Sequence, residues 1–214
     1  MTRVNDERDA FRAVPDREAY LRANSHLPGP RANLELLAAA AEEVAPDWAR
    51  RWADQAPGTD STDVFLVCVG LVALGRMLAG GDEAALPTLR LRAGDGEWRI
   101  REAVAIGLQR LGDERPDRLA QVATDWAVVG TPLEARAAVA AVAEPRLLRD
   151  GRLIAPAIAV LDAATEQGRA CREQTRGRRP CTASGARLCV ERRGRRRPSP
   201  RLGRFPKMGR GRRS

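Results

Sequence analysis

The side chains best suited to acid, base or nucleophilic chemistry are few in this sequence and lie far apart. His26 is the only histidine among 214 residues, and it stands beside a Pro-Gly-Pro turn with no candidate partner nearby. A histidine-dependent triad or a multi-histidine metal site therefore has no local support. Adjacent acids such as Glu42 and Glu43 diverge on a helix, whereas the carboxyls of an acid–base pair must face each other. The sequence thus predicts no catalytic centre and no cofactor.

The four cysteines do not form a metal-binding pattern. Cys171, Cys181 and Cys189 are widely spaced and match no Cys-x-x-Cys zinc motif. Cys68 lies in an apolar stretch, where a buried free thiol behaves as a small hydrophobic side chain. We therefore predict no metal site and assign Cys68 to core packing.

Arginines offer the remaining polar chemistry, because a groove lined by guanidinium groups can bind phosphates. The candidates are Arg99, Arg101, Arg110, Arg136 and Arg146. The charge balance argues against this use. Residues 166–214 hold 17 of the 37 Lys and Arg and three of the 28 acids, which leaves 20 basic and 25 acidic residues, a net charge of −5, in residues 1–165. An acidic domain exerts no general attraction on a polyanion, so nucleic-acid binding in a groove is the less favoured interpretation.

Helices must position these side chains, because apolar residues recur at helical spacing between turns rich in Gly, Pro and Asp. Residues 64–78 are apolar nearly all round, so we expect that helix to be central, with neighbours on both sides. Asn33 is expected to cap the helix that follows it. The main expected helices cover residues 34–44, 64–78, 82–91, 98–111, 118–129, 133–142 and 153–164.

Membrane and secretion signals are not recognisable in the sequence. Residues 1–10 are polar and charged, unlike a signal peptide. The longest apolar run, residues 64–74, is shorter than the roughly 20 residues that cross a bilayer. We therefore expect a cytoplasmic protein without a membrane partner.

An internal repeat defines the expected architecture. Arg101-Glu-Ala-Val-Ala recurs as Arg136-Ala-Ala-Val-Ala, 35 residues later, and this interval holds two helices and two turns, which is typical of a solenoid. The segment Gly94-Asp-Gly-Glu-Trp-Arg-Ile-Arg-Glu-Ala-Val-Ala-Ile-Gly-Leu-Gln-Arg-Leu-Gly resembles the consensus of HEAT repeats. That resemblance implies an all-α, right-handed α-solenoid of helical hairpins over residues 15–165. It also implies a structural ladder in which Asp95, Arg101 and, in the next repeat, Arg136 pair with neighbouring repeats.

HEAT repeats indicate architecture rather than activity, so we expect a non-catalytic scaffold that binds a protein partner through the concave face or ridge of the stack. The alternative comes from bacterial DNA-alkylation-repeat proteins, which the chain distantly resembles. Their glycosylase members hold an alkylated nucleotide with Trp and Asp, and Trp126 with Asp125 is the nearest counterpart here. The candidate binding residues are Trp98, Arg99, Asp125, Trp126 and Arg146. For the tryptophans themselves, Trp48, Trp52, Trp98 and Trp126, our favoured interpretation is packing between helices.

The two ends of the chain differ from the periodic region. Residues 1–14 are charged and aperiodic, and we expect them to be disordered. Residues 166–214 are rich in Arg and Gly, and at face value they form a disordered basic arm that binds RNA, DNA or acidic surfaces. Our favoured explanation is a shift of reading frame near Glu166, because Ala and Val codons of a GC-rich gene give Arg codons out of frame. A one-base shift of permissible codons for residues 185–197 gives an Ala- and Val-rich segment that would continue the stack.

Overall fold

The structure is a computed structural model that describes residues 3–56, 61–149 and 151–176. Every regular element in these ranges is helical, so the expected all-α class is confirmed. The elements are α1 (Arg3–Ala13), α2 (Arg17–Asn24), α3 (Leu34–Glu43), α4 (Pro46–Asp54), α5 (Ser61–Ala79), the 3-10 helix η1 (Glu83–Ala85), α6 (Leu86–Ala93), α7 (Trp98–Glu114), α8 (Pro116–Val129), α9 (Pro132–Val142), α10 (Pro145–Leu148) and α11 (Ile154–Arg176).

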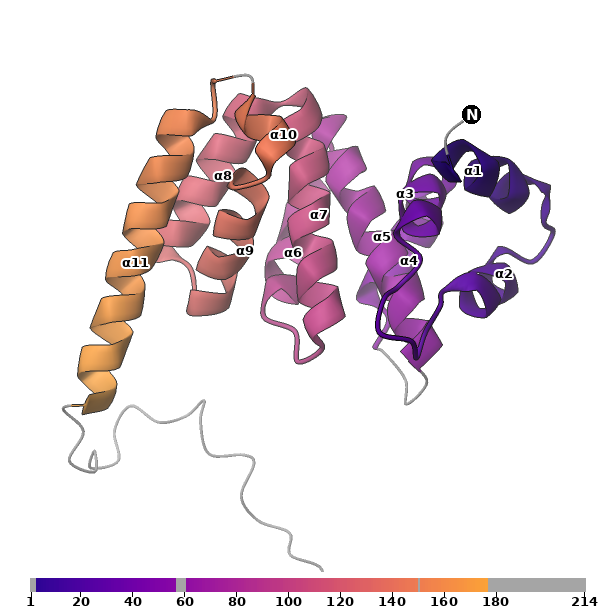
Figure 1. The fold of residues 1–214 in the computed structure, drawn as a ribbon, viewed down its shortest axis with the longest axis horizontal. Coiled ribbons are helices and arrows are strands. Elements are labelled where there is room, and N and C mark those ends of the chain that lie inside the picture. The colour runs from indigo at the N-terminus through magenta and orange to yellow at the C-terminus, as the bar shows by residue number, and fades with distance from the viewer. Residues whose placement is uncertain (1–2, 57–60, 150, 177–214) are drawn as a thin grey trace, which may run out of the picture. The chain divides into compact units, whose positions relative to one another are not determined.

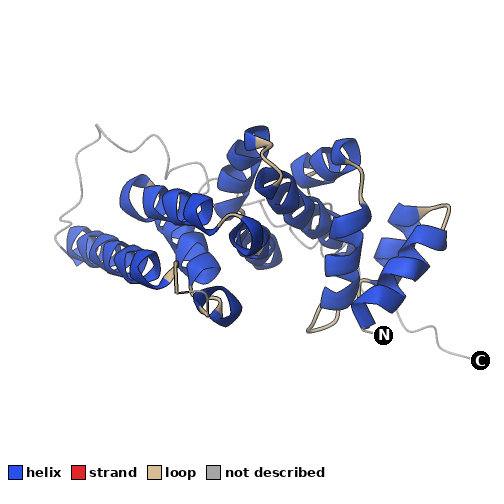
Figure 2. Ribbon diagram, turned by 90° about the horizontal axis from the view of Figure 1, so that it is seen from above, coloured by secondary structure: helices blue, strands red, loops and turns tan. Residues whose placement is uncertain are grey.

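The helices pack side by side in chain order and form a stack of two layers (Figures 1 and 2). Along one layer, α1 packs on α3, α3 on α5, α5 on α7, and α7 on α9. The other layer places α4 against α5, α6 against α7, and α8 against α9. Helix α11 packs on both α8 and α9 and is the last element of the stack.

Local sequence explains where several helices begin and end. Asn33 Oδ1 accepts a hydrogen bond from the backbone N–H of Leu36 at 3.0 Å, so the predicted cap of α3 is confirmed. Thr131 and Glu134 form a reciprocal capping box at the start of α9. Proline begins α4, α8, α9 and α10, where a first-turn N–H would have no partner within the helix. The chain leaves α5 through Gly81, whose φ of +99° suits glycine.

Helix α5 is the central element, as predicted. Fourteen of its 19 residues are buried, because α3, α4 and α7 pack around it. By length and composition α5 is also the one described helix that could cross a membrane, although its uninterrupted apolar run is the shorter one expected from the sequence. Within the fold 78% of that helix window is buried, as in a core helix of a globular protein.

Helices α5 and α7 approach so closely that glycine occupies both sides of the contact. A Cβ atom added to Gly75 would lie 2.1 Å from the carbonyl oxygen of Gly107. A Cβ atom added to Gly107 would lie 2.8 Å from the carbonyl oxygen of Leu71. Since the obstructing atoms are backbone, they cannot rotate away, and the two glycines fix how near the two helices come.

The expectation that residues 1–14 are disordered is wrong for most of that segment, which forms α1. Phe11 is fully buried among the core residues, and α1 packs on α3. Arg12 donates two hydrogen bonds to the carboxylate of Glu43, at 2.8 and 2.7 Å. The helix was missed because Phe11 is its one buried side chain and its other contacts are polar, such as those of Arg8 and Arg12 with Glu43, so it shows no apolar period.

The Arg12–Glu43 pair makes the attachment of α1 dependent on pH. Hydrogen bonds from Arg12, followed by its charge, hold the pKa of Glu43 below its usual value of 4.5. A lowered pKa means that the contribution to stability is present at neutral pH and is lost as the pH falls through the folded-state value. In a carboxyl NMR titration, Arg12→Gln should raise the pKa of Glu43 toward 4.5, whereas Arg3→Gln in the same helix should not. An unchanged Glu43 pKa in Arg12→Gln would contradict the pairing.

At the other end, the stack extends beyond the expected boundary at residue 165. Helix α11 continues without interruption to Arg176, and the compact unit ends at the same residue. Gln167 Nε2 donates to the carbonyl oxygen of Gly130 at 2.6 Å, and Arg169 pairs with Glu166 at 2.8 Å. These contacts prolong the helix after its apolar period stops, which explains the difference. Residues 177–214 lie outside the described residues, so the basic arm and the frame shift stay predictions.

Candidate functional site

An apolar groove of about 550 Å³ lies where residues 27–37, α5 and α7 meet. We call it the Trp98 groove. Its walls include the side chains of Leu34, Leu37, Phe65, Trp98, Ala103 and Ile106. Phe65 and Leu37 are buried at its base, whereas Leu34 and Trp98 are 58% and 50% exposed at its edge. Large apolar side chains at an open edge are available to a ligand or a partner.

Two neighbouring residues at the start of α7 shape one side of the Trp98 groove. The guanidinium of Arg99 lies over the ring of Trp98, 4.5 Å from its centroid. Arg99 Nη2 also donates to the carbonyl oxygen of Gly29 at 3.1 Å, which connects α7 to the loop before α3. The predicted pair Trp98 and Arg99 is therefore brought together, with the indole half exposed and the guanidinium held by its neighbours.

Cys68 lies at the base of the Trp98 groove without being a nucleophile. Burial raises the pKa of its thiol to about 12, so the thiolate is not formed near neutral pH. The Sγ atom donates instead to the carbonyl oxygen of Arg99 at 3.5 Å. This matches the sequence-based assignment of Cys68 to core packing.

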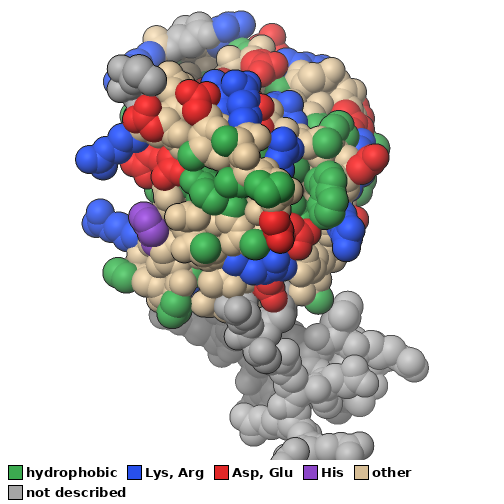
Figure 3. Space-filling model, turned by 90° about the vertical axis from the view of Figure 1, so that its right-hand side faces the viewer, with side chains coloured by type: hydrophobic (Ala, Val, Ile, Leu, Met, Phe, Trp, Pro, Cys, Tyr) green, Lys and Arg blue, Asp and Glu red, His purple; other side chains and the backbone are tan. Residues whose placement is uncertain are grey.

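Charges of both signs surround the Trp98 groove. Arg31 and Glu35 lie on the α3 side, and Glu102 lies on the α7 side, where it pairs with Arg136 of α9. Acidic and basic side chains are likewise interspersed with hydrophobic ones on the end of the molecule seen in Figure 3. An apolar groove with a mixed polar rim suits side chains of a protein better than the uniform charge of a polyanion.

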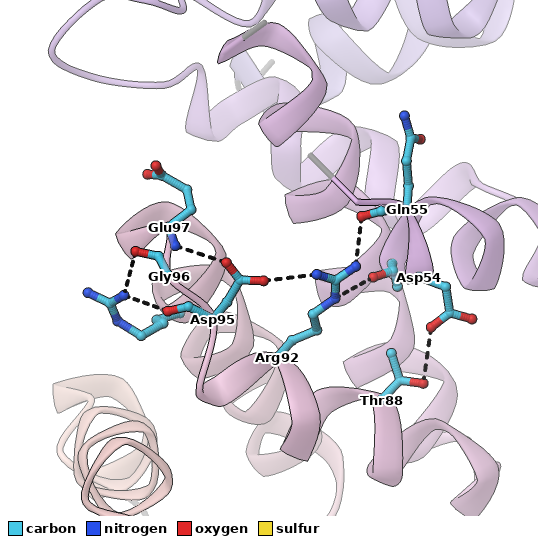
Figure 4. Close-up of polar contacts among 9 residues, drawn as sticks. Asp54, Gln55, Thr88, Arg92, Asp95, Gly96 and Glu97 are labelled. Atoms are coloured by element: carbon cyan, nitrogen blue, oxygen red, sulfur yellow. Dashed lines mark hydrogen bonds and ion pairs between the residues drawn. The ribbon is translucent and has the colours of Figure 1, made fainter. Parts of the chain in front are cut away.

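The expected ladder residues are present, but they are connected differently from the HEAT expectation. Arg101 Nη1 donates to the carbonyl oxygens of Asp95 and Gly96 at 2.7 and 3.1 Å, within its own turn (Figure 4). The carboxylate of Asp95 accepts from Arg92 Nη1 at 2.8 Å. In contacts between described residues, Arg136 is the one of the three that reaches a preceding repeat unit, through its ion pair with Glu102 on α7. The HEAT resemblance implied that Asp95 and Arg101 pair with a neighbouring hairpin. The hydrogen bonds described here instead lie within their own hairpin, between α6, the turn and α7.

Arg92 makes the connection that was assigned to Arg101. Its Nε donates to the carbonyl oxygen of Ala53 at 2.9 Å, and its Nη2 donates to that of Gln55 at 2.7 Å, at the end of α4 (Figure 4). Asp95 holds the same guanidinium from the opposite side. Sequence reasoning missed Arg92 because its two main partners are backbone carbonyls, which leave no residue-type signal.

Loss of the Arg92 guanidinium should therefore destabilise the stack. Arg92→Met keeps the apolar stem and is expected to lower the free energy of unfolding by about 2 kcal/mol, because two partly buried backbone carbonyls and Asp95 lose a charged donor. Urea denaturation followed by circular dichroism measures the change. Arg169→Met is the matched control, since that arginine is 61% exposed and pairs only with Glu166 among the described residues. Equal effects of the two substitutions would count against the Arg92 connection.

The other candidate binding residues do not line the Trp98 groove. Trp126 is only 1% exposed, because α8 turns it into the core together with Leu119 and Val122, so a contact between its indole and a nucleotide is not supported. Asp125 is half exposed and pairs with Arg90 at 3.0 Å. Arg146 makes two hydrogen bonds to Asp113, each of 3.0 Å.

Arginine–acid pairs between helices recur at nearly constant separation along the sequence. The partners stand 31–35 residues apart in the pairs Arg12–Glu43, Arg50–Asp82, Arg118–Glu83, Arg90–Asp125, Arg136–Glu102 and Arg146–Asp113. Arg110 also lies 3.6 Å from a carboxylate, that of Glu42, although these partners are about two repeats apart in the sequence. Most arginines proposed to line a phosphate groove are therefore neutralised by a carboxylate, and a search for Arg and acid about one repeat apart could have found these pairs.

In the described ranges, no group of three or more His, Cys, Asp or Glu is close enough to hold a metal ion. His26 is exposed in the loop before α3, with a φ of 60°. Comparison of the chain with models of known protein families, with curated proteins and with solved structures found no match. The Trp98 groove is thus interpreted from its own geometry.

Proposed function

We propose that this protein is a HEAT-like, right-handed α-solenoid that acts as a non-catalytic scaffold and holds a segment of a protein partner in the Trp98 groove. The observation that carries the proposal is the half-exposed indole of Trp98 beside Leu34 over a buried apolar base. Aromatic and arginine side chains at the edge of an apolar pocket are the residues that dominate protein–protein binding energy.

Two features support the repeat architecture. The first is the sequence repeat from Arg101 to Arg136, 35 residues apart. The second is the set of inter-helix ion pairs whose partners stand 31–35 residues apart. A stack in which equivalent positions of successive hairpins meet accounts for both.

A protein partner is favoured over damaged DNA on three grounds. Trp126 is buried, and Asp125 already pairs with Arg90, so the residues closest to a glycosylase pattern are occupied. Arg146 is held by Asp113, which reduces its use as a phosphate ligand. The rim of the Trp98 groove carries both Arg31 and Glu35, whereas a nucleic-acid groove is mostly basic.

Photo-crosslinking tests this proposal with the full chain. A photoreactive phenylalanine analogue replaces Trp98 in cells that make the protein, and the same analogue replaces Leu91, which is 75% exposed on α6, as the control. We expect a discrete protein adduct from position 98 that is absent at position 91. Adducts mainly with nucleic acid, or no difference between the two positions, would contradict the proposal.

A further inference from the structure

A second pocket, of about 550 Å³, lies where the start of α2 meets α4, near the N-terminal end of the stack (Figure 1). We call it the Trp48 pocket. Helix α4 contributes Trp48, Arg51 and Trp52 to it, and residues 15–18 contribute its other main part. Trp52 is buried, and its Nε1 donates to the carboxylate of Glu18 at 2.8 Å, which connects α4 to α2. Trp48 is 44% exposed, so one indole belongs to the core and the other is open to a ligand.

Two arginines of the Trp48 pocket lie over aromatic rings. The guanidinium of Arg51 lies 5.0 Å from the ring centroid of Trp48, and that of Arg17 lies 5.2 Å from the ring centroid of Phe11. Within the described part of the chain, neither guanidinium has a hydrogen bond or an ion pair. Arg99, which also lies over a ring, is bonded to a backbone carbonyl instead. The N–H groups of Arg17 and Arg51 therefore remain free to bind a ligand.

The two acids of the Trp48 pocket differ from its arginines, because each acid already accepts hydrogen bonds. Asp16 Oδ1 accepts from the backbone N–H of Ala19 at 3.0 Å and caps α2. Glu18 accepts from Arg22 at 3.2 Å and from Trp52 Nε1 at 2.8 Å. Since both acids have donors and neither arginine has an acceptor, the charge that is left for a ligand is positive.

A guanidinium that lies on an aromatic ring is well prepared to bind an oxyanion. The ring holds the flat group in one orientation, and the N–H groups at its edge stay free to form two parallel hydrogen bonds. Two such groups in one pocket match the charge of a phosphate monoester, which is close to −2 at neutral pH. A volume of about 550 Å³ is typical of sites for small molecules.

We propose that the Trp48 pocket binds a small aromatic molecule that carries a phosphate group. Arg17 and Arg51 bind the phosphate, and the exposed indole of Trp48 contacts the aromatic ring of the ligand. Pro15 and Val44 add apolar surface to the same pocket. The proposal does not depend on the Trp98 groove, because the two surfaces share no residue.

An NMR titration of the full, ¹⁵N-labelled chain with phenyl phosphate tests the proposal. The indole N–H signals of the four tryptophans report on separate places, so phosphate bound by other arginines does not enter the measurement. The signal of Trp48 is assigned by its loss in Trp48→Phe. We expect it to shift with a dissociation constant of about 1 mM or lower, while the signal of the buried Trp126 stays in place. Benzoate, with a single charge, should bind at least about threefold more weakly, and benzyltrimethylammonium should not shift the signal.

Replacement of the two arginines tests their part in binding. Arg51→Met and Arg17→Met each keep the apolar stem and should weaken the binding of phenyl phosphate at least about tenfold. Arg149→Met is the matched control, since that arginine is exposed, lies outside the Trp48 pocket and has no ion pair within the described ranges. It should leave the dissociation constant unchanged. The remaining signals of each variant show whether its fold is retained.

Several results would overturn the proposal. One is a Trp48 signal that phenyl phosphate does not shift in a saturable way, and another is a preference for benzoate or for benzyltrimethylammonium. Equal affinities of Arg51→Met, Arg17→Met and Arg149→Met would also contradict it. Crosslinking at position 98 is decided separately, since Trp98 is not part of this pocket.

Discussion

An alanine in place of Gly75 is expected to destabilise the protein by about 3 kcal/mol, which lowers the melting temperature by about 6–12 °C. The added Cβ atom would lie 2.1 Å from the carbonyl oxygen of Gly107 and 2.4 Å from its carbonyl carbon. Because these are backbone atoms of α7, relief requires α5 and α7 to move apart, and this disturbs packing along the whole contact. The better helix propensity of alanine, worth up to about 1 kcal/mol, offsets only part of that cost.

The matched control for Gly75→Ala is Gly96→Ala. A Cβ atom at Gly96 meets nothing within 4 Å, so its effect should stay within about 0.5 kcal/mol. Thermal unfolding followed by circular dichroism gives both values under the same conditions. If Gly75→Ala were as harmless as Gly96→Ala, the two helices would not be held at the distance that the structure shows.

The sequence predicts that α5 is buried, but it does not predict which residue of another helix Gly75 contacts. The burial of α5 followed from its composition alone, since a helix that is apolar all round must have neighbours on several sides. The contact between Gly75 and Gly107 did not follow, because it joins positions 32 residues apart and depends on the crossing of two helices. Apolar period and composition thus predict which face of a helix is buried, whereas the residue that it contacts depends on how the helices cross in the folded chain.

The candidate site likewise has residues that the sequence predicts and a shape that it does not. Trp98 and Arg99 were found from sequence because their residue types suit binding, and they are neighbours on one helix. The Trp98 groove itself could not be predicted, because its second wall comes from the loop before α3, and Arg99 bonds to Gly29 across 70 positions of sequence. Arg92 escaped notice for a related reason, since its partners are the carbonyls of Ala53 and Gln55.

Replacement of Trp126 by alanine is expected to destabilise the protein by about 3–5 kcal/mol, the largest effect that we anticipate for one substitution. Its indole is 1% exposed and fully enclosed by the core of α8 and neighbouring helices, so truncation leaves a large cavity. Trp98→Ala removes the same number of atoms from a side chain that is 50% exposed, and should cost only about 1 kcal/mol. Urea denaturation of the two variants measures the difference directly.

The pair of tryptophan variants also separates packing from binding. Trp126→Ala should reduce stability and, at temperatures where the chain stays folded, leave the crosslinking at position 98 unchanged, because Trp126 does not line the Trp98 groove. A cost below about 1 kcal/mol, together with weaker binding of an alkylated duplex, would instead indicate that Trp126 becomes accessible and contacts DNA. That result would favour the DNA-alkylation-repeat interpretation, whereas a large loss of stability assigns Trp126 to the core and leaves Trp98 as the tryptophan available to a partner.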